Sequence, residues 1–118
     1  GHPKTGFSYD MGKSWTVLRD LQDIKVSKGL DAVTLKNGWH VLVYNPHHRY
    51  PLALAVSRDG VNWDEVLPIL DCKDTSDMDY PSVIQSDNGN IHVVYSYDDK
   101  HKIKHIELDT DYVLKYAK

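Results

Sequence analysis

The sequence predicts an all-β protein built from β-propeller blades, and three observations carry this prediction. Apolar and polar residues alternate over short runs, which is the pattern of half-buried strands rather than of helices. Turn-forming residues separate these runs, as expected for hairpins. The pattern then recurs after about 50 residues, and a repeat of this length with four short strands per unit is typical of propeller blades.

The first clear pair of strands lies in DAVTLKNGWHVLVYNP, residues 31–46. Two runs rich in β-forming residues flank Asn37 and Gly38. Because these residue types tolerate positive φ, we expect a two-residue hairpin turn at this point.

A second copy of this hairpin follows in YPSVIQSDNGNIHVVYSYDD. Asn88 and Gly89 separate its two runs, and Gly89 stands 51 positions after Gly38. Tyr44 and Tyr95 each follow their glycine by six positions. The two hairpins therefore belong to equivalent units of one repeat.

The strands that follow the hairpins keep nearly the same spacing. PLALAVSRD ends at Asp59 and KIKHIELD ends at Asp109, 50 positions later. The opening GFSYDMGKSWTVL ends like the later AVSRDGVNWDEVL, so the chain begins with the last two strands of an earlier unit. We expect a single partial propeller of about two to two and a half blades over residues 1–118, with a half-blade at 1–30, a complete blade at 31–70 and a further blade at 79–118.

Length and composition narrow the classes of function. A chain of 118 residues with 41% hydrophobic and 26% charged residues has the composition of one globular domain. Its net charge of -3 leaves no broad basic surface, so we expect neither nucleic acid nor a membrane as a partner. Cys72 is the only cysteine, which excludes an internal disulfide and a multi-thiolate metal site. No segment reaches the roughly 20 apolar residues of a membrane span, and no signal peptide is visible.

Two short motifs, SYDMGKSW at 8–15 and SRDGVNW at 57–63, share a serine, an aspartate, a glycine and a closing tryptophan. The aspartate can accept backbone N–H bonds across a turn, the glycine suits a position where a side chain is awkward, and the tryptophan can fold back over the hairpin. We interpret both motifs as structural staples rather than catalytic sites. Their residues are Ser8, Asp10, Gly12, Trp15, Ser57, Asp59, Gly60 and Trp63.

These motifs resemble the Asp-box, or BNR, repeats of sialidases. The segments DAVTLKNGWHVLVYNPHHRYPLALAVSRDG and DYPSVIQSDNGNIHVVYSYDDKHKIKHIELD are similar to the carboxy-terminal portion of the sialidase (neuraminidase)-like BNR family. A single Asp-box occurs in many propellers, whereas two boxes in order with VYNP, Arg-Tyr-Pro-Leu and Asp-Tyr-Pro-Ser are more specific. The resemblance covers nearly the whole chain.

The resemblance implies a six-bladed propeller that acts as a glycoside hydrolase on the terminal sugars of glycans, typically sialic acid. It implies a retaining mechanism with a tyrosine nucleophile, a Glu that assists it, an Asp acid/base and an arginine triad on the substrate carboxylate. Tyr80, in DYPSVIQSDNG, matches the nucleophile's position. A glycan substrate, no cofactor, no catalytic metal and a secreted or periplasmic location are the corresponding expectations.

The geometry of a four-stranded blade places the other candidate residues. The connection into strand one and the loop between strands two and three lie at the same edge of the blade, which forms one rim of the propeller. The Asp-boxes lie at the opposite rim. We expect the substrate-binding residues at the first rim, because side chains that converge at the mouth of a ring are a usual ligand-site arrangement. They are Asp31, Asp79, His47, His48, Arg49 and Tyr97.

Alternatives stay open for several of these residues. Tyr80 could pack its ring on a neighbouring blade and bond its hydroxyl to the backbone. Arg49 could bind a substrate carboxylate through its bidentate fork or pair with a nearby aspartate. His47 and His48 are adjacent, and adjacent residues of an extended chain point to opposite faces, which disfavours joint metal ligation.

The chain departs from the sialidase pattern in its arginines. It holds only Arg19, Arg49 and Arg58, and Arg58 falls in an Asp-box turn at the opposite rim. No Glu is clearly positioned to activate Tyr80, and no residue clearly replaces the acid/base Asp. We therefore expect that this chain alone does not complete the catalytic site.

Two other functions fit the same residues. The first is a non-catalytic carbohydrate-binding or scaffold propeller, in which Trp39, Tyr44 and Tyr80 pack or stack. The second is a related propeller hydrolase or lyase that acts on another sugar through His47 or His48, which the small number of arginines favours.

The size of the chain predicts further blades. Closed propellers need roughly four to eight blades, and an open stack would expose strand edges and apolar faces. The missing blades would come from the rest of a longer chain or from other copies. Three copies would supply about six blades, so a trimer is one expected assembly.

Overall fold

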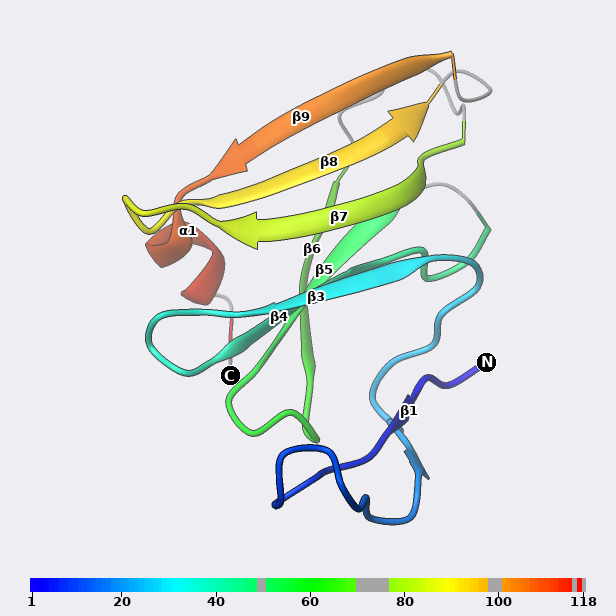
Figure 1. Cartoon of the computed structure of the whole chain (residues 1–118). Helices are drawn as coiled ribbons and strands as arrows, with labels where there is room; N and C mark the ends of the chain where they lie inside the picture. Colours follow the sequence, from blue (N-terminus) through cyan, green and yellow to red (C-terminus); the bar gives the residue numbers. More distant parts are fainter. Residues whose placement is uncertain (49–50, 70–76, 98–100, 116, 118) are drawn as a thin grey trace.

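Nine strands form three antiparallel sheets in the computed structural model of the chain (Figure 1). The structure describes residues 1–48, 51–69, 77–97, 101–115 and 117, and these counts refer to them. The prediction of an all-β chain is confirmed, whereas three sheets do not make a closed ring and the propeller stays a prediction. Among the described residues, no helix is long and apolar enough to cross a membrane.

The central sheet has four strands in the order of the chain, each paired with the next. Before it, two short strands form a separate ribbon, and after it comes a sheet of three strands. The ribbon consists of β1 (Lys4–Thr5) and β2 (Arg19–Asp20), the central sheet of β3 (Leu30–Thr34), β4 (His40–Tyr44), β5 (Leu52–Ser57) and β6 (Asp64–Ile69), and the last sheet of β7 (Asp79–Gln85), β8 (Ile91–Tyr97) and β9 (Lys102–Leu108).

A hairpin joins β3 to β4 as predicted, but the prediction of a two-residue turn is wrong. The N–H of Leu35 donates to the carbonyl of Trp39 (2.7 Å), and the N–H of Gly38 donates to the carbonyl of Leu35 (2.9 Å), so three residues form the loop. Gly38 has a φ of 89°, whereas Asn37 is not among the residues with positive φ. A type I turn followed by one left-handed residue is the usual three-residue hairpin, and it needs only the glycine.

The hairpin between β7 and β8 has the same construction. The N–H of Ser86 donates to the carbonyl of Asn90 and the N–H of Gly89 donates to the carbonyl of Ser86, both at 2.9 Å. In both loops the asparagine before the glycine caps the turn, since its Oδ1 accepts the N–H two residues later. The repeat found in the sequence is thus also a repeat of local structure.

A short helix, α1 (Thr110–Leu114), ends the fold and departs from the strand pattern. Its N-cap is Asp109, whose carboxylate accepts the N–H groups of Asp111 and Tyr112. Such capping is a common start of a helix. Val113 turns into the core and is fully buried.

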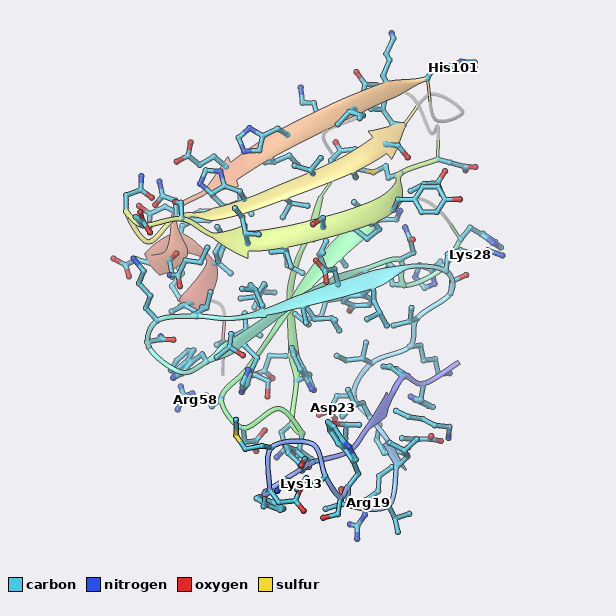
Figure 2. All side chains as sticks on the ribbon, in the orientation of Figure 1. Lys13, Arg19, Asp23, Lys28, Arg58 and His101 are labelled. Carbon is cyan, nitrogen blue, oxygen red and sulfur yellow. The ribbon has the colours of Figure 1, made fainter. Side chains whose placement is uncertain are left out.

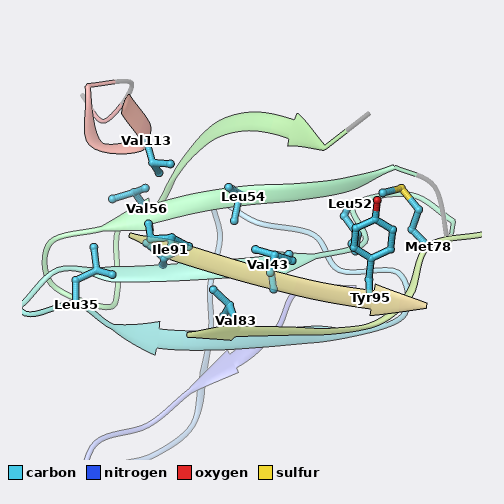
Figure 3. Close-up of a cluster of buried hydrophobic side chains, with 12 residues drawn as sticks. Leu35, Val43, Leu52, Leu54, Val56, Met78, Val83, Ile91, Tyr95 and Val113 are labelled. Carbon is cyan, nitrogen blue, oxygen red and sulfur yellow. The ribbon is translucent and has the colours of Figure 1, made fainter. Parts of the chain in front are cut away.

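One hydrophobic core lies between the β3–β6 sheet and the β7–β9 sheet (Figure 3). Val43 and Leu54 of the central sheet meet Val83, Ile91 and Tyr95 of the last sheet, and none of these residues is more than 4% exposed. Burying large apolar side chains between two sheets is the main source of their stability.

The opposite face of the central sheet packs on the N-terminal segment. Leu42 and Tyr44 contact Ile24 there. Val93 and Tyr95, which follow Leu42 and Tyr44 by 51 positions, lie in the core against the central sheet. In both sheets, the face that carries these equivalent residues packs on the preceding part of the chain. The units therefore stack in chain order (Figure 1).

Candidate functional site

The first Asp-box turn lies between β1 and β2 and is held by its own side chains. Asp10 accepts the N–H of Ser14 (2.9 Å) and the hydroxyl of Ser14 (2.6 Å). The hydroxyl oxygen of Ser8 accepts the N–H of Gly12 (2.7 Å), and the indole N–H of Trp15 donates to the carbonyl of Gly12 (3.2 Å).

The second Asp-box turn joins β5 to β6 and has the same design. Asp59 accepts the backbone N–H of Asn62 (2.8 Å) and its side-chain amide (2.7 Å). The hydroxyl oxygen of Ser57 accepts the N–H of Gly60 (2.8 Å), and the indole N–H of Trp63 donates to the carbonyl of Gly60 (3.2 Å). In both turns the carboxylate bonds to its own loop, so its role there is to close the turn.

These bonds stabilise the ionised aspartates. The Ser14 side chain, followed by the Ser14 N–H, lowers the pKa of Asp10 from 3.8 to about 2. The backbone N–H groups of Asn62 and Val61, followed by the Asn62 side chain, hold the pKa of Asp59 well below 3.8. A carboxylate that accepts several N–H bonds is expected to stay charged to low pH.

The low pKa values predict a loss of stability in acid. Asp59→Asn should lower the melting temperature by several degrees at pH 7, because one of the two carboxylate oxygens is replaced by a donor facing the Asn62 amide. A carboxyl whose pKa is lower in the folded state contributes stability above about pH 4, and this contribution is lost as the pH falls further. Thermal unfolding from pH 7 to pH 2 should show a constant difference between the two proteins above about pH 5 and a difference that narrows steadily below about pH 4. Asp87→Asn, in an exposed hairpin loop, is the control that should change little, and a difference that does not vary with pH would contradict this account.

The rim is the edge of the stack where β3 and β7 begin, where β4 ends and β5 begins, and where β8 ends and β9 begins. Lys28, just before β3, and His101, just before β9, lie on this side in Figure 2, whereas Arg58 lies on the other. This arrangement puts Arg58 and its Asp-box turn away from the rim, as expected from the sequence.

Tyr80 is the most unusual residue of the rim. Its φ is 51°, and apart from glycines only Met11 shares a positive φ within the described part of the chain. The register of β7 against β8 shifts between Asp79 and Ser82, so Tyr80 lies in a bulge of the strand. Its side chain is 70% exposed. A left-handed backbone costs a residue with a Cβ roughly 1–2 kcal/mol.

The two rim aspartates are differently placed. One carboxylate oxygen of Asp31 accepts the N–H of Val83 (2.9 Å) and so joins β3 to β7. Asp79 is 1% exposed, at the first position of β7. Both residues lie next to the segment that carries Tyr80, and their predicted role in substrate binding stays a prediction.

The remaining candidates spread along the same rim. His47 and His48 are exposed after the end of β4. Tyr97, at the end of β8, is half-buried against the core, with its ring 6.2 Å from that of Tyr95. Arg49 lies outside the described residues. Among the residues that are described, no group of three or more His, Cys, Asp or Glu could hold a metal ion.

Two aromatic residues proposed as stacking platforms have other contacts. Tyr44 is buried, and its hydroxyl donates to Glu65 (2.6 Å). Burial, together with this carboxylate, raises the pKa of Tyr44 well above its ordinary value. Trp39 is half-buried, and the guanidinium carbon of Arg58 lies 4.6 Å from its ring centroid. Tyr44 therefore contributes to packing rather than to an open ligand surface.

Sequence reasoning missed the role of Asn45, which follows β4. Asn45 is 1% exposed; its Oδ1 accepts the N–H of Gly29 (3.2 Å), and its Nδ2 donates to the carbonyl of Met78 (3.0 Å). Asn45 thereby links the segment before β3 to the segment before β7. Its partner Met78 lies two residues before Tyr80. The VYNP motif contains this residue, but the identity of its partners is a property of the fold.

The geometry defines a class of protein: an all-β chain of stacked antiparallel sheets with an Asp-box turn at two equivalent positions. The comparison with known families agrees. The family described as the BNR repeat-like domain matches residues 5–93, and the chain belongs to this family. No curated protein and no solved structure matches the chain.

Proposed function

We propose that this chain is part of a sialidase-like glycoside hydrolase that acts on terminal sugars of glycans, with Tyr80 as the nucleophile. Membership of the BNR repeat-like family supports the proposal, because such domains occur in sialidase-like glycosidases. The observation that carries it is the conformation of Tyr80, an exposed phenol on a left-handed backbone in a strand bulge.

Backbone strain of this kind persists only when the surrounding structure imposes it, and it is concentrated at active sites and ligand clamps. Tyr80 lies in this bulge at the rim, and its side chain is 70% exposed. A neutral phenol suits attack on the anomeric carbon of an anionic sugar better than a carboxylate would. The Tyr80 oxygen would bond to this carbon as the bond to the leaving oxygen breaks, and water would then release the sugar with retention.

The other rim residues would bind the substrate. Arg49 is proposed to hold the sugar carboxylate through its fork of donors. Asp79 and Asp31 would border the sugar beneath Tyr80, with His47, His48 and Tyr97 around it. The remaining arginines, the acid/base and the base for Tyr80 would come from blades outside this chain.

A non-catalytic carbohydrate-binding or scaffold propeller is the second candidate, and one contact favours it. The Asp31 carboxylate accepts the N–H of Val83, which is a structural use of a residue that the hydrolase would employ at its site. In this case the rim would bind a glycan without cleaving it.

Tyr80→Phe in the complete protein tests the proposal. We expect kcat on a fluorogenic sialoside to fall by at least about a hundredfold, because the change removes only the attacking oxygen. Tyr9→Phe is the matched control, since it removes the same atom from an exposed tyrosine of the first Asp-box turn, which has no part in the proposed site, and should leave the activity unchanged. Unchanged turnover by the Tyr80→Phe protein on every glycoside that it cleaves would overturn the mechanism. Saturable sugar binding without hydrolysis in the unmodified protein would favour the second candidate.

A further inference from the structure

The bulge that carries Tyr80 is shaped in part by Pro81, the next residue. A proline disfavours the right-handed helical conformation for the residue before it, so Tyr80 is confined to extended or left-handed backbone. Pro81 also has no N–H group to give to the strand ladder, and the register against β8 shifts between Asp79 and Ser82. Pro81 therefore permits the left-handed conformation of Tyr80, with its φ of 51°, but does not select it.

Gly29, in the segment before β3, approaches this proline closely. A Cβ atom on Gly29 would lie 3.2 Å from Cδ of Pro81 and 3.7 Å from Oδ1 of Asn45. The first distance is shorter than an ordinary van der Waals contact. A residue with a side chain could not take this place without moving the Pro81 ring, so glycine allows the close approach of the two segments. Pro81 is itself buried in β7.

Two hydrogen bonds fix the backbone on either side of the bulge. Before it, Nδ2 of Asn45 donates to the carbonyl of Met78 (3.0 Å). After it, Oδ2 of Asp31 accepts the N–H of Val83 (2.9 Å). Asp31 lies in β3, which runs beside β7 (Figure 1), and Asn45 directly follows β4. Both bonds therefore reach the bulge from the preceding sheet.

We propose that Gly29, Asp31 and Asn45 position Tyr80 for reaction by holding this bulge from the preceding sheet. The inference rests on the proposed role of Tyr80 as the nucleophile. The three residues contact the chain one residue after, three residues after and two residues before Tyr80. A strained backbone persists only where surrounding contacts impose it, and these contacts come from outside β7. Because a misplacement of about 1 Å can cost about a hundredfold in rate, the three residues set the chemical step through the backbone.

Gly29→Ala in the complete protein tests the close approach. The new Cβ atom forces Pro81 to move by a few tenths of an ångström, so the Cα and Cβ chemical shifts of ¹³C-labelled Tyr80, which report its backbone conformation, should change. The kcat on the fluorogenic sialoside should fall about tenfold and KM should change by less than about twofold, because the substitution affects the position of the nucleophile more than the binding of the sugar. Gly29→Val should have larger effects of the same kind. Ser27→Ala, at an exposed position of the same segment, is the control that should change neither, and melting temperatures confirm that the variants fold.

Asp31→Ala tests the hydrogen bond after the bulge. It removes the acceptor of the Val83 N–H, so amide exchange at Val83 should become at least about tenfold faster. Asp31→Asn keeps an oxygen that can accept this N–H and should keep the protection of the unmodified protein. The Tyr80 shifts should move in the alanine variant. Exchange and chemical shifts are measured without turnover, so neither depends on the proposed reaction.

The outcomes separate this inference from the proposed function. Tyr80 shifts that stay unchanged in both Gly29→Ala and Asp31→Ala would overturn the inference, whatever the Tyr80→Phe protein does. Full protection of Val83 in Asp31→Ala would also overturn it. Shifts that move without a fall in kcat for Gly29→Ala, in a protein that Tyr80→Phe inactivates, would overturn the positioning role. Shifts that move as expected, together with unchanged turnover by Tyr80→Phe, would overturn the hydrolase mechanism and support the hold on the bulge.

Discussion

Leu54→Ala should lower the free energy of unfolding by about 3 kcal/mol, within the usual range for a buried leucine. Leu54 is fully buried in β5 and faces the core between the central and last sheets (Figure 3). The change removes apolar contacts and leaves a cavity that rigid strands on both sides cannot close. Urea denaturation followed by tryptophan fluorescence measures it, and the melting temperature should fall by about 10 °C.

Ile84→Ala is the control for this substitution. Ile84 in β7 is 57% exposed, so its truncation should cost less than about 1 kcal/mol. A loss below about 1 kcal/mol for Leu54→Ala would mean that the two sheets do not depend on this core. A single transition in both variants would show that the sheets unfold together.

The sequence predicted the strands well because their signal is local. Alternation within β8, where Ile91, Val93 and Tyr95 are buried and the polar His92 and Ser96 between or beside them are less buried, is visible in the residues themselves. The 51-residue offset from Gly38 to Gly89 also predicted that the two hairpins would match. The turn type was wrong because Asn and Gly are compatible with both a two-residue loop and a three-residue loop. The pairing of the flanking strands decides between the two loops, and the turn residues alone do not predict this pairing.

The candidate site was only partly predictable, since its geometry depends on contacts between distant segments. The sequence singled out Tyr80, but its left-handed backbone follows from the bulge in β7 against β8. The bond from Val83 to Asp31 joins residues of two different sheets. The pairing of His92 with His105 likewise needs the register of β8 and β9. No local pattern carries this information.

Asn45→Leu should cost about 3 kcal/mol and should also disturb the rim. The side chain of Asn45 is the hydrogen-bond partner of the Gly29 N–H and the Met78 carbonyl. An apolar replacement of similar size leaves the buried Met78 carbonyl and the half-buried Gly29 N–H without this partner, and the loss at a buried group costs roughly 1–3 kcal/mol. Because Met78 lies two residues before Tyr80, the bulge should loosen as well. Denaturant unfolding measures the first effect, and amide exchange of residues 78–83 measures the second.

Asn45→Asp keeps the hydrogen bond from Gly29 and removes the one to Met78. The stability of this variant should depend on pH with a definite sign. The new carboxylate still accepts the Gly29 N–H, but its second oxygen faces the Met78 carbonyl and repels it. Burial and this repulsion should raise the pKa of the introduced carboxyl above the ordinary value of about 3.9. Its protonated form is favoured in the folded state, so the variant should be least stable near pH 7 and should recover relative to the unmodified chain as the pH falls toward 4. Asn45→Leu has no group to titrate and should show no such recovery. If the two variants kept a constant difference across this range, the donor to Met78 would not be what holds the entry of β7 in place.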